Sequence, residues 1–193
     1  MALLNKKDLF SLEKYSEIRN EFRAKVMKHK ENRRLAFNEH AVLYFEDALT
    51  MQYQVQEMLR IERIFEAEGI QQELDVYNTL IPDGSNWKAT FMIEYTNVQE
   101  RKEALAKLIG VESSIWIKVE ESQKVYAIAN EDMDRATEDK TSAVHFMRFE
   151  LTKDMITNIK VGLPIMFGID HDLYKTEIIV APKIQRALII DLD

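Results

Sequence analysis

The sequence of 193 residues predicts an α+β fold in which a helical N-terminal third packs against a mostly antiparallel sheet. Apolar residues recur at helical spacing early in the chain, whereas they alternate with polar residues in most of the remainder. The segments between expected strands are short, which favours antiparallel pairing because parallel strands need long crossovers. No internal repeat and no linker rich in Gly, Pro or Ser divides the chain, so we expect one domain over residues 1–193.

The first expected helix begins at Ser11, a residue type that caps helix N-termini, and it ends near Lys30. Its apolar stripe is formed by Tyr15, Ile18, Phe22 and Val26. Residues 23–34 hold six Lys or Arg and one acid. Because the whole chain is acidic, we interpret these cations as complementing the helix dipole rather than as a nucleic-acid or lipid patch.

Two short strands are expected next, at residues 35–37 and 42–45, joined by a polar turn. Asp47 is expected to cap a second, long helix over about residues 48–67, which Gly69 closes. A shorter helix with one apolar side follows, and a Pro-Asp-Gly turn ends it. The N-terminal part of the chain is therefore expected to be mainly helical.

From Trp87 onward the apolar period changes to two residues, which is typical of strands with one buried face. Strands are expected at residues 87–95, 115–119, 125–129, 142–151, 164–170 and 176–181. Helices are expected at residues 97–108 and 153–161, and a glycine follows each of them. The last two strands are expected to form a hairpin.

The composition excludes several classes of site. The chain has no cysteine, and therefore no disulfide, thiolate nucleophile or cysteine-ligated metal centre. Lys plus Arg number 26 and Asp plus Glu number 33, and the net charge of −7 argues against a nucleic-acid partner. No segment approaches the roughly 20 apolar residues that cross a bilayer, and the N-terminus does not resemble a signal peptide. We therefore expect a cytoplasmic protein without membrane association.

The common catalytic motifs are also missing. The sequence contains no G-x-G-x-x-G or G-x-x-x-x-G-K-[ST] phosphate loop, no G-x-S-x-G nucleophile elbow and no Glu-x-x-His metal pair. Asn130, Asp132 and Asp134 have the spacing of a calcium loop, but Arg135 stands where such a loop needs glycine. We interpret this segment as a solvated acidic loop, and no local motif predicts a metal site.

One acidic residue in the second helix is unusual because of its position. The apolar stripe of this helix comprises Met51, Val55, Met58, Leu59, Ile61 and Phe65. Glu62 projects within about 30° of the centre of the stripe at 100° per residue. A carboxylate on a buried face is costly unless a cation, a metal, several donors or a proton neutralises it. We therefore expect Glu62 to have a partner in the protein interior.

Arg148 is the expected partner of Glu62. Alternation in its strand places Arg148 on one face with Val144 and Phe146, and its planar fork suits a buried carboxylate. We predict a Glu62–Arg148 contact. Two interpretations stay open at this point: a structural ion pair between helix and sheet, or an open catalytic or ligand-binding site.

The last expected hairpin supplies two further candidates for a site. His171 and Tyr174 lie in the polar loop at residues 170–175, at a strand end where functional groups often collect. Asp170 or Asp172 could orient the imidazole, and Tyr174 could donate a proton. An ordinary polar hairpin loop is the alternative interpretation.

Several segments together resemble a functionally uncharacterised bacterial family of about 190–200 residues. They are residues 11–15 (SLEKY), 19–23 (RNEFR), 56–64 (QEMLRIERI), 77–82 (YNTLIP), 142–149 (SAVHFMRF) and 170–174 (DHDLY). The resemblance covers nearly the whole chain, and residues 56–64 are its most specific part. It implies a gene setting near rubrerythrin and iron–sulfur oxidoreductases, and hence a redox or stress-related role. It implies no catalytic residues.

Three functional hypotheses follow. The first is a cytoplasmic, non-catalytic accessory or binding protein that serves a redox system through a protein partner, with a homodimer as an open alternative. The second is an enzyme or small-molecule sensor with a polar pocket at the helix–sheet boundary, where Glu62, Arg148, His171 and Tyr174 would act. The third is a metal protein that uses Glu57, Glu62 or Glu66 with a histidine. The sequence does not identify a cofactor.

Overall fold

The structure, a computed structural model, describes residues 3–131 and 140–193, so Asp132 and Asp134 of the expected acidic loop lie outside the described residues. The helices are α1 (Leu12–Lys30), α2 (Ala48–Glu62), α3 (Ala67–Asn78), α4 (Val98–Lys107), α5 (Lys153–Lys160) and α6 (Pro182–Ile189), with single 3-10 turns at η1 (Lys6–Asp8) and η2 (Val111–Ser113). The strands are β1 (Arg34–Ala36), β2 (Ala41–Phe45), β3 (Asn86–Ile93), β4 (Ile115–Val119), β5 (Val125–Tyr126), β6 (Ile128–Ala129), β7 (Val144–Glu150), β8 (Ile165–His171) and β9 (Tyr174–Ile179).

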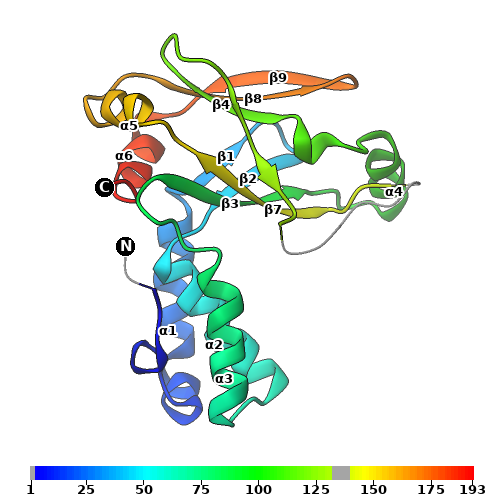
Figure 1. Ribbon diagram of the computed structural model, residues 1–193. Helices are drawn as coiled ribbons and strands as arrows, with labels where there is room; N and C mark the ends of the chain where they lie inside the picture. The colour runs from blue at the N-terminus through cyan, green and yellow to red at the C-terminus, as the bar shows by residue number, and fades with distance from the viewer. Residues whose placement is uncertain (1–2, 132–139) are drawn as a thin grey trace.

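The α+β class and the antiparallel pairing are confirmed, but the strands form two sheets instead of one. The first sheet has the order β1-β2-β3-β7-β6 and the second has the order β5-β4-β8-β9. Every pair of neighbouring strands is antiparallel. The chain passes from the second sheet to the first between β5 and β6, where Ala127 N–H donates to the Ile115 carbonyl. Figure 1 shows the two sheets one above the other.

The main core lies between the inner faces of the two sheets, and aromatic rings fill it. The ring of Phe167 lies 5.4 Å from that of Phe45 and 5.2 Å from that of Phe149, both in edge-to-face orientation. Trp87 is fully buried beside them and donates its indole N–H to the Leu188 carbonyl at 2.9 Å. This bond ties α6 to the first sheet, so the C-terminal helix closes one end of the core.

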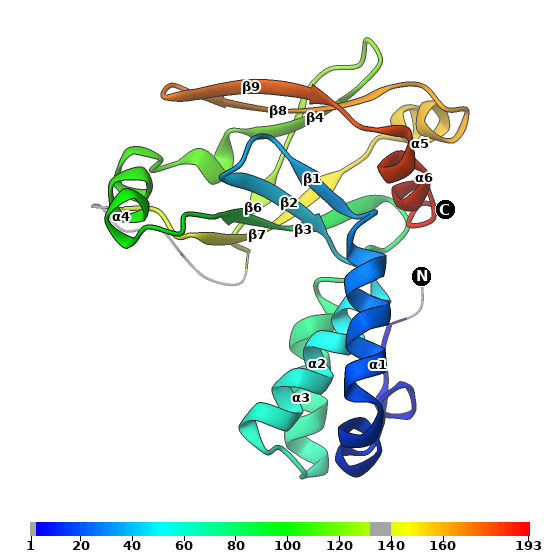
Figure 2. The ribbon, with the colours of Figure 1, turned by 180° about the vertical axis from the view of Figure 1, so that it is seen from behind.

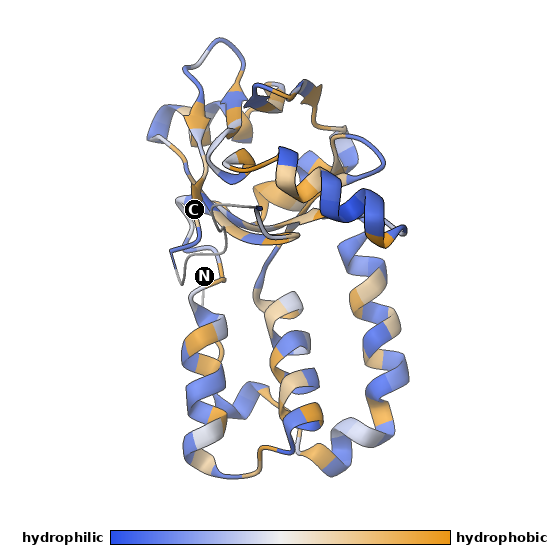
Figure 3. Cartoon of the chain, turned by 90° about the vertical axis from the view of Figure 1, so that its right-hand side faces the viewer, coloured by the Kyte–Doolittle hydropathy of each residue, from blue (hydrophilic) through white to orange (hydrophobic). Residues whose placement is uncertain are grey.

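Helices α1, α2 and α3 form a bundle that extends away from the sheets (Figures 1 and 3). Figure 2 shows α1 running directly into β1. The bundle has small cores of its own, with Tyr15 and Phe22 on α1 and with Val55, Leu59 and Leu74 between α2 and α3. Among the described residues, no helix combines the length and the apolar character that a membrane span requires.

Two boundaries differ from the expected ones. The second helix ends at Glu62 rather than near residue 67, because Arg63 adopts a left-handed conformation (φ 55°) and its N–H bonds to the Leu59 carbonyl. Gly69, the expected closing residue, therefore lies inside α3. Helix α6, with Pro182 at its first position, was not expected as a separate element.

Candidate functional site

Glu62 does not lie in the protein interior, and the prediction that it is buried is wrong. It is the last residue of α2, and it is exposed. Helix α2 starts beside the first sheet and rises about 1.5 Å per residue, so Glu62 lies roughly 20 Å from that end. The stripe that placed Glu62 at its centre included Ile61 and Phe65, which are 59% and 66% exposed. The buried face of α2 ends before them.

The carboxylate of α2 that does find partners within the protein is the partly buried one of Glu57. Its Oε1 accepts hydrogen bonds from the Tyr15 hydroxyl and from Arg19 Nε, each at 2.7 Å, and its Oε2 accepts from Arg19 Nη2 at 2.8 Å. The Arg19 fork, with help from the Tyr15 hydroxyl, lowers the pKa of Glu57 to about 2 although burial opposes the shift. Glu57 thus joins α1 to α2 as a structural ion pair and is not available as a metal ligand.

Arg148 pairs with other acids, so the predicted Glu62–Arg148 contact is also wrong. Its Nε and Nη2 donate to both oxygens of Glu131, at 2.8 and 2.7 Å, and its Nη1 bonds to Glu150. These residues line a cavity of about 460 Å³ between β7, β3 and the end of α3, where Lys88 also lies. A polar pocket therefore exists at the helix–sheet boundary, but its arginine is already engaged by two carboxylates and Glu62 is not part of it.

His171 and Tyr174 face each other in the β8–β9 register, but their polar atoms have different surroundings. The Nε2 of His171 lies 3.0 Å from the Ile109 carbonyl, and the Leu173 N–H donates to its Nδ1 at 3.2 Å. His171 is thus occupied by backbone groups. Tyr174, in contrast, reaches into a cavity, and it is the sequence-predicted residue around which the candidate site is built.

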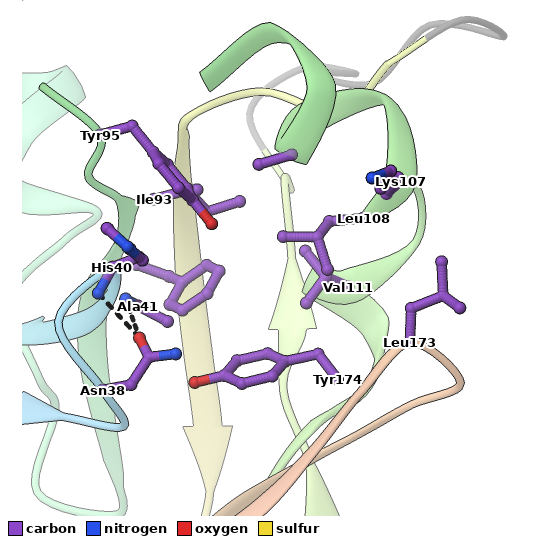
Figure 4. Close-up of a pocket in the computed structure, with 12 residues that line it drawn as sticks. Asn38, His40, Ala41, Ile93, Tyr95, Lys107, Leu108, Val111, Leu173 and Tyr174 are labelled. Carbon is purple, nitrogen blue, oxygen red and sulfur yellow. Dashed lines mark hydrogen bonds between the residues drawn. The ribbon is translucent and has the colours of Figure 1, made fainter. Parts of the chain in front are cut away.

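The cavity has a volume of about 200 Å³ and lies at the end of the sheets next to α4 (Figure 4). The residues that line it are Asn38, His40, Ala41, Phe91, Ile93, Tyr95, Ala104, Lys107, Leu108, Val111, Leu173 and Tyr174. They come from the β1–β2 turn, the end of β3, α4, η2 and the β8–β9 turn, and most are apolar. Such a mostly apolar lining with few polar groups is typical of small-molecule sites.

The hydroxyl of Tyr174 is the distinctive polar group of this cavity. Its oxygen is inaccessible to solvent and has no hydrogen-bond partner among the described residues. Burial raises the pKa of Tyr174 to about 12, with a smaller contribution from the phenol of Tyr95. The group therefore keeps its proton and can donate a hydrogen bond. Figure 4 shows the Tyr174 ring extending across the cavity toward Asn38.

The opposite wall is held rigidly by the turn before β2. Asn38 Oδ1 accepts hydrogen bonds from the backbone N–H groups of His40 and Ala41, both at 2.8 Å. The imidazole of His40 stacks on Tyr95 with 3.9 Å between ring centroids, and its Nδ1 donates to the Glu94 carbonyl at 2.8 Å. A flat aromatic surface is thus fixed in place at the cavity.

The arrangement can bind a small molecule, but it does not assemble a nucleophile with a base. Donation of Nδ1–H to a backbone carbonyl leaves Nε2 of His40 as the acceptor, but the described lining holds no Ser, Thr or Cys nucleophile for it, and the raised pKa of Tyr174 keeps that phenol protonated at neutral pH. In the described part of the chain, no group of three or more His, Asp or Glu residues is placed to hold a metal ion. Lys107 adds a cation to the lining, at the end of α4.

Sequence reasoning selected Tyr174 but missed Asn38, His40 and Tyr95. Asn38 carried a recognisable signal, because Asn favours turns and bonds to the backbone two residues ahead. His40 and Tyr95 are separated by 55 positions and become neighbours through the pairing of β2 with β3. No local pattern could place them together.

The profile of the family described as "Protein of unknown function (DUF3501)" matches residues 3–192, nearly the whole chain. The chain belongs to the DUF3501 family. The resemblance seen in its sequence segments is therefore confirmed, while the family description assigns no activity. No curated protein shows significant similarity to this DUF3501 member.

One solved structure is very similar to this DUF3501 chain over its full length. It is the crystal structure of a novel protein of unknown function from Burkholderia pseudomallei, with 45% sequence identity and a TM-score of 0.94. The match covers 100% of both chains. The fold described above is thus shared with a bacterial protein whose function is also unknown.

Proposed function

We propose that this protein is a cytoplasmic, non-catalytic binding protein whose ligand is a small, mostly apolar molecule that carries a hydrogen-bond acceptor. The cavity around Tyr174 is its proposed site. The observation that carries the proposal is the buried Tyr174 hydroxyl without a partner in a cavity with apolar walls. It joins the non-catalytic role of the first hypothesis drawn from the sequence to the small-molecule pocket of the second, at a different place in the fold.

The class of ligand follows from the chemistry of the lining. A buried hydroxyl without a partner costs about 1–3 kcal/mol, and a ligand that satisfies it offsets this cost. Because Tyr174 stays protonated, the complementary group is an acceptor such as a carbonyl oxygen. The stacked His40–Tyr95 surface favours a flat molecule, and a volume of about 200 Å³ limits it to one or two rings.

The redox setting that the family resemblance implies fits a binding role without chemistry of its own. Because the chain contains no cysteine, a redox centre would have to come from the ligand or from a protein partner. In this proposal the protein serves as an accessory or sensor component, and occupation of the cavity is the signal.

The proposal is tested with two probes of similar size, acetophenone, which carries a carbonyl acceptor, and ethylbenzene, which does not. Binding to the full chain is followed by protein NMR. We expect acetophenone to bind several-fold more tightly, as one hydrogen bond of about 1 kcal/mol allows, and to shift resonances of Tyr174, Ile93 and Val111.

The Tyr174→Phe variant should remove this preference and bind both probes equally. Tyr53→Phe is the matched control, because Tyr53 is a partly buried tyrosine of the helical bundle away from the cavity, and it should keep the preference. Equal binding of both probes by the unmodified protein, or shifts outside the cavity, would contradict the proposal.

A further inference from the structure

A second cavity lies between the helical bundle and the outer face of the first sheet. It has a volume of about 450 Å³ and receives residues from α1, α2, α3, β2, β3 and β7. Figure 3 shows the bundle helices standing below the sheet. Its lining does not overlap with that of the cavity around Tyr174, so the two are independent sites.

Glu46 is the charged group that makes this second cavity unusual. It follows β2 directly, and its side chain lies on the outer side of the sheet, where Oε1 accepts a hydrogen bond from the Thr90 hydroxyl at 2.7 Å. The residue is only 5% exposed, and its Oε2 is buried without a hydrogen-bond partner among the described residues. A buried carboxylate oxygen in this state is costly unless a donor or cation reaches it.

Arg33 bonds to the backbone of Glu46 and not to its side chain. Arg33 Nη2 donates to the backbone carbonyl of Glu46 at 3.1 Å and to the carboxylate of Asp191, while Nε and Nη1 donate to the Phe45 and Ala187 carbonyls. Lys30 lines the same cavity, but it forms no ion pair with an acid within residues 3–131 and 140–193. Glu46 thus has a buried carboxylate oxygen that pairs with no cation of the described residues, although Lys30 lies in the same lining.

The remaining walls suit an organic cation. Met27, Met51 and Met92 contribute polarizable, adaptable side chains, and Tyr44, Tyr77 and Phe146 contribute aromatic rings. Aromatic faces attract cations electrostatically, and this attraction strengthens when the cation leaves water. The cavity volume falls within the range of small-molecule sites.

We propose that the cavity around Glu46 is a second binding site, for a small organic cation whose positive group pairs with the Glu46 carboxylate while its apolar part packs against the methionines. The site is built from the bundle and from the sheet, so its occupant contacts both parts of the fold.

Three probes that share a benzyl group test this assignment: benzylammonium, benzyl alcohol and phenylacetate. The full chain is labelled at its methionine methyl groups, and each probe is titrated by NMR. We expect benzylammonium to shift the methyls of Met27, Met51 and Met92, with the methyls of Met155 and Met166 unchanged as internal controls. The alcohol and the carboxylate should bind at least tenfold more weakly.

The Glu46→Gln variant should weaken benzylammonium binding at least tenfold, while unshifted methyls of Met155 and Met166 report that it is folded. Tyr174→Phe should leave this binding unchanged, so the second site is tested separately from the proposed function. Tighter binding of the alcohol or phenylacetate, no binding at all, or cation binding that appears only after Lys30→Met would overturn the proposal. If Glu46→Gln does not fold, the comparison of the three probes on the wild-type protein still tests the proposal.

Discussion

Arg33 forms a buried ion pair with Asp191, and this pair ties the segment after α1 to the C-terminal end of the chain. The same guanidinium donates to the Phe45 and Ala187 carbonyls and lies 3.4 Å from the carboxylate of Asp47. Arg33 therefore serves two buried acids, and Asp47 has a second partner in His29, whose Nε2 lies 2.5 Å from its Oδ2. The surroundings of these two acids have consequences for how stability depends on pH.

The first prediction concerns Asp191. Burial raises the pKa of Asp191 from 3.8 to about 6, against the influence of Arg33. The folded protein thus holds this proton more tightly than the unfolded chain, so the stability it contributes is full below about pH 4 and is lost as the pH rises through 6. The loss amounts to about 3 kcal/mol. Urea unfolding should therefore show that Asp191→Asn becomes more stable relative to wild type as the pH rises from about 4 to 6.

The matched control for Asp191 is the exposed Asp172, whose change to Asn should leave the pH profile of the wild type unaltered. A difference between Asp191→Asn and wild type that stays constant from pH 4 to 7 would contradict the first prediction.

Asp47 contributes to stability in a different pH range from Asp191. Burial opposes a fall in its pKa, but Arg33 and the Thr50 N–H together lower the pKa of Asp47. Its contribution to stability is therefore present above about pH 4 and is lost below it.

The second prediction compares two glutamates of α2. Glu57 holds Arg19 and Tyr15, whereas Glu62 is exposed, so Glu57→Gln should destabilise the protein by roughly 1–3 kcal/mol and Glu62→Gln by less than about 0.5 kcal/mol. Because the pKa of Glu57 is lowered to about 2, its contribution is present above pH 4.5 and fades as the pH falls toward 2. Chemical unfolding at pH 7 and pH 3 measures both effects. Equal losses at the two positions would refute it.

The third prediction concerns Gly168 in β8. A Cβ atom there would collide with the buried Trp116 ring and would lie 2.8 Å from the Thr176 carbonyl of the neighbouring strand. Gly168→Ala should therefore destabilise the protein by at least about 2 kcal/mol, because neither neighbour can move freely. Gly162→Ala, with φ of +89° and open space around it, should cost about 1 kcal/mol from backbone strain alone. Thermal unfolding of both variants measures which substitution costs more stability. A larger loss for Gly162→Ala would argue against a Trp116 ring packed on Gly168.

The fourth prediction uses the unpartnered hydroxyl of Tyr174. Tyr174→Phe removes a buried polar atom that has no partner to lose, so the ligand-free protein should keep its stability or gain up to about 1 kcal/mol. Tyr126→Phe removes a hydroxyl that donates to Asp170 at 2.7 Å and should lose about 0.5–1 kcal/mol. Calorimetry of the two variants measures both changes in stability. A clear loss at Tyr174 would mean that its hydroxyl already has a partner.

The sequence-based interpretation succeeded where local rules act. Ser11 and Asp47 cap helices α1 and α2, and each side chain accepts the expected backbone N–H. Alternation correctly placed His145, Met147 and Phe149 on one face of β7 and Arg148 on the other, and the structure buries the face that lacks Arg148. These features depend on neighbours a few residues away, which the sequence displays directly.

The candidate sites could be predicted only in part, and Glu62 shows why. A helical stripe gives the direction of each side chain, but it does not say where the helix ends or how far its neighbours reach. Arg63 turned the chain before the stripe was complete, and Ile61 and Phe65 remained exposed. Tyr174 was recognised from its place in a hairpin loop, whereas Glu46 carried no signal because its burial depends on three helices and a sheet.

By itself the sequence determined the α+β class, most helices and strands, the antiparallel hairpins and the exclusion of cysteine chemistry, since these follow from composition and periodicity. Only the tertiary structure decided that the strands divide into two facing sheets, that Arg33 meets Asp191 across the chain, and that two cavities enclose Tyr174 and Glu46. The physical reason is that burial and pairing depend on which distant surfaces meet. A single carboxylate or hydroxyl gains its special character from that environment and not from its neighbours in the chain.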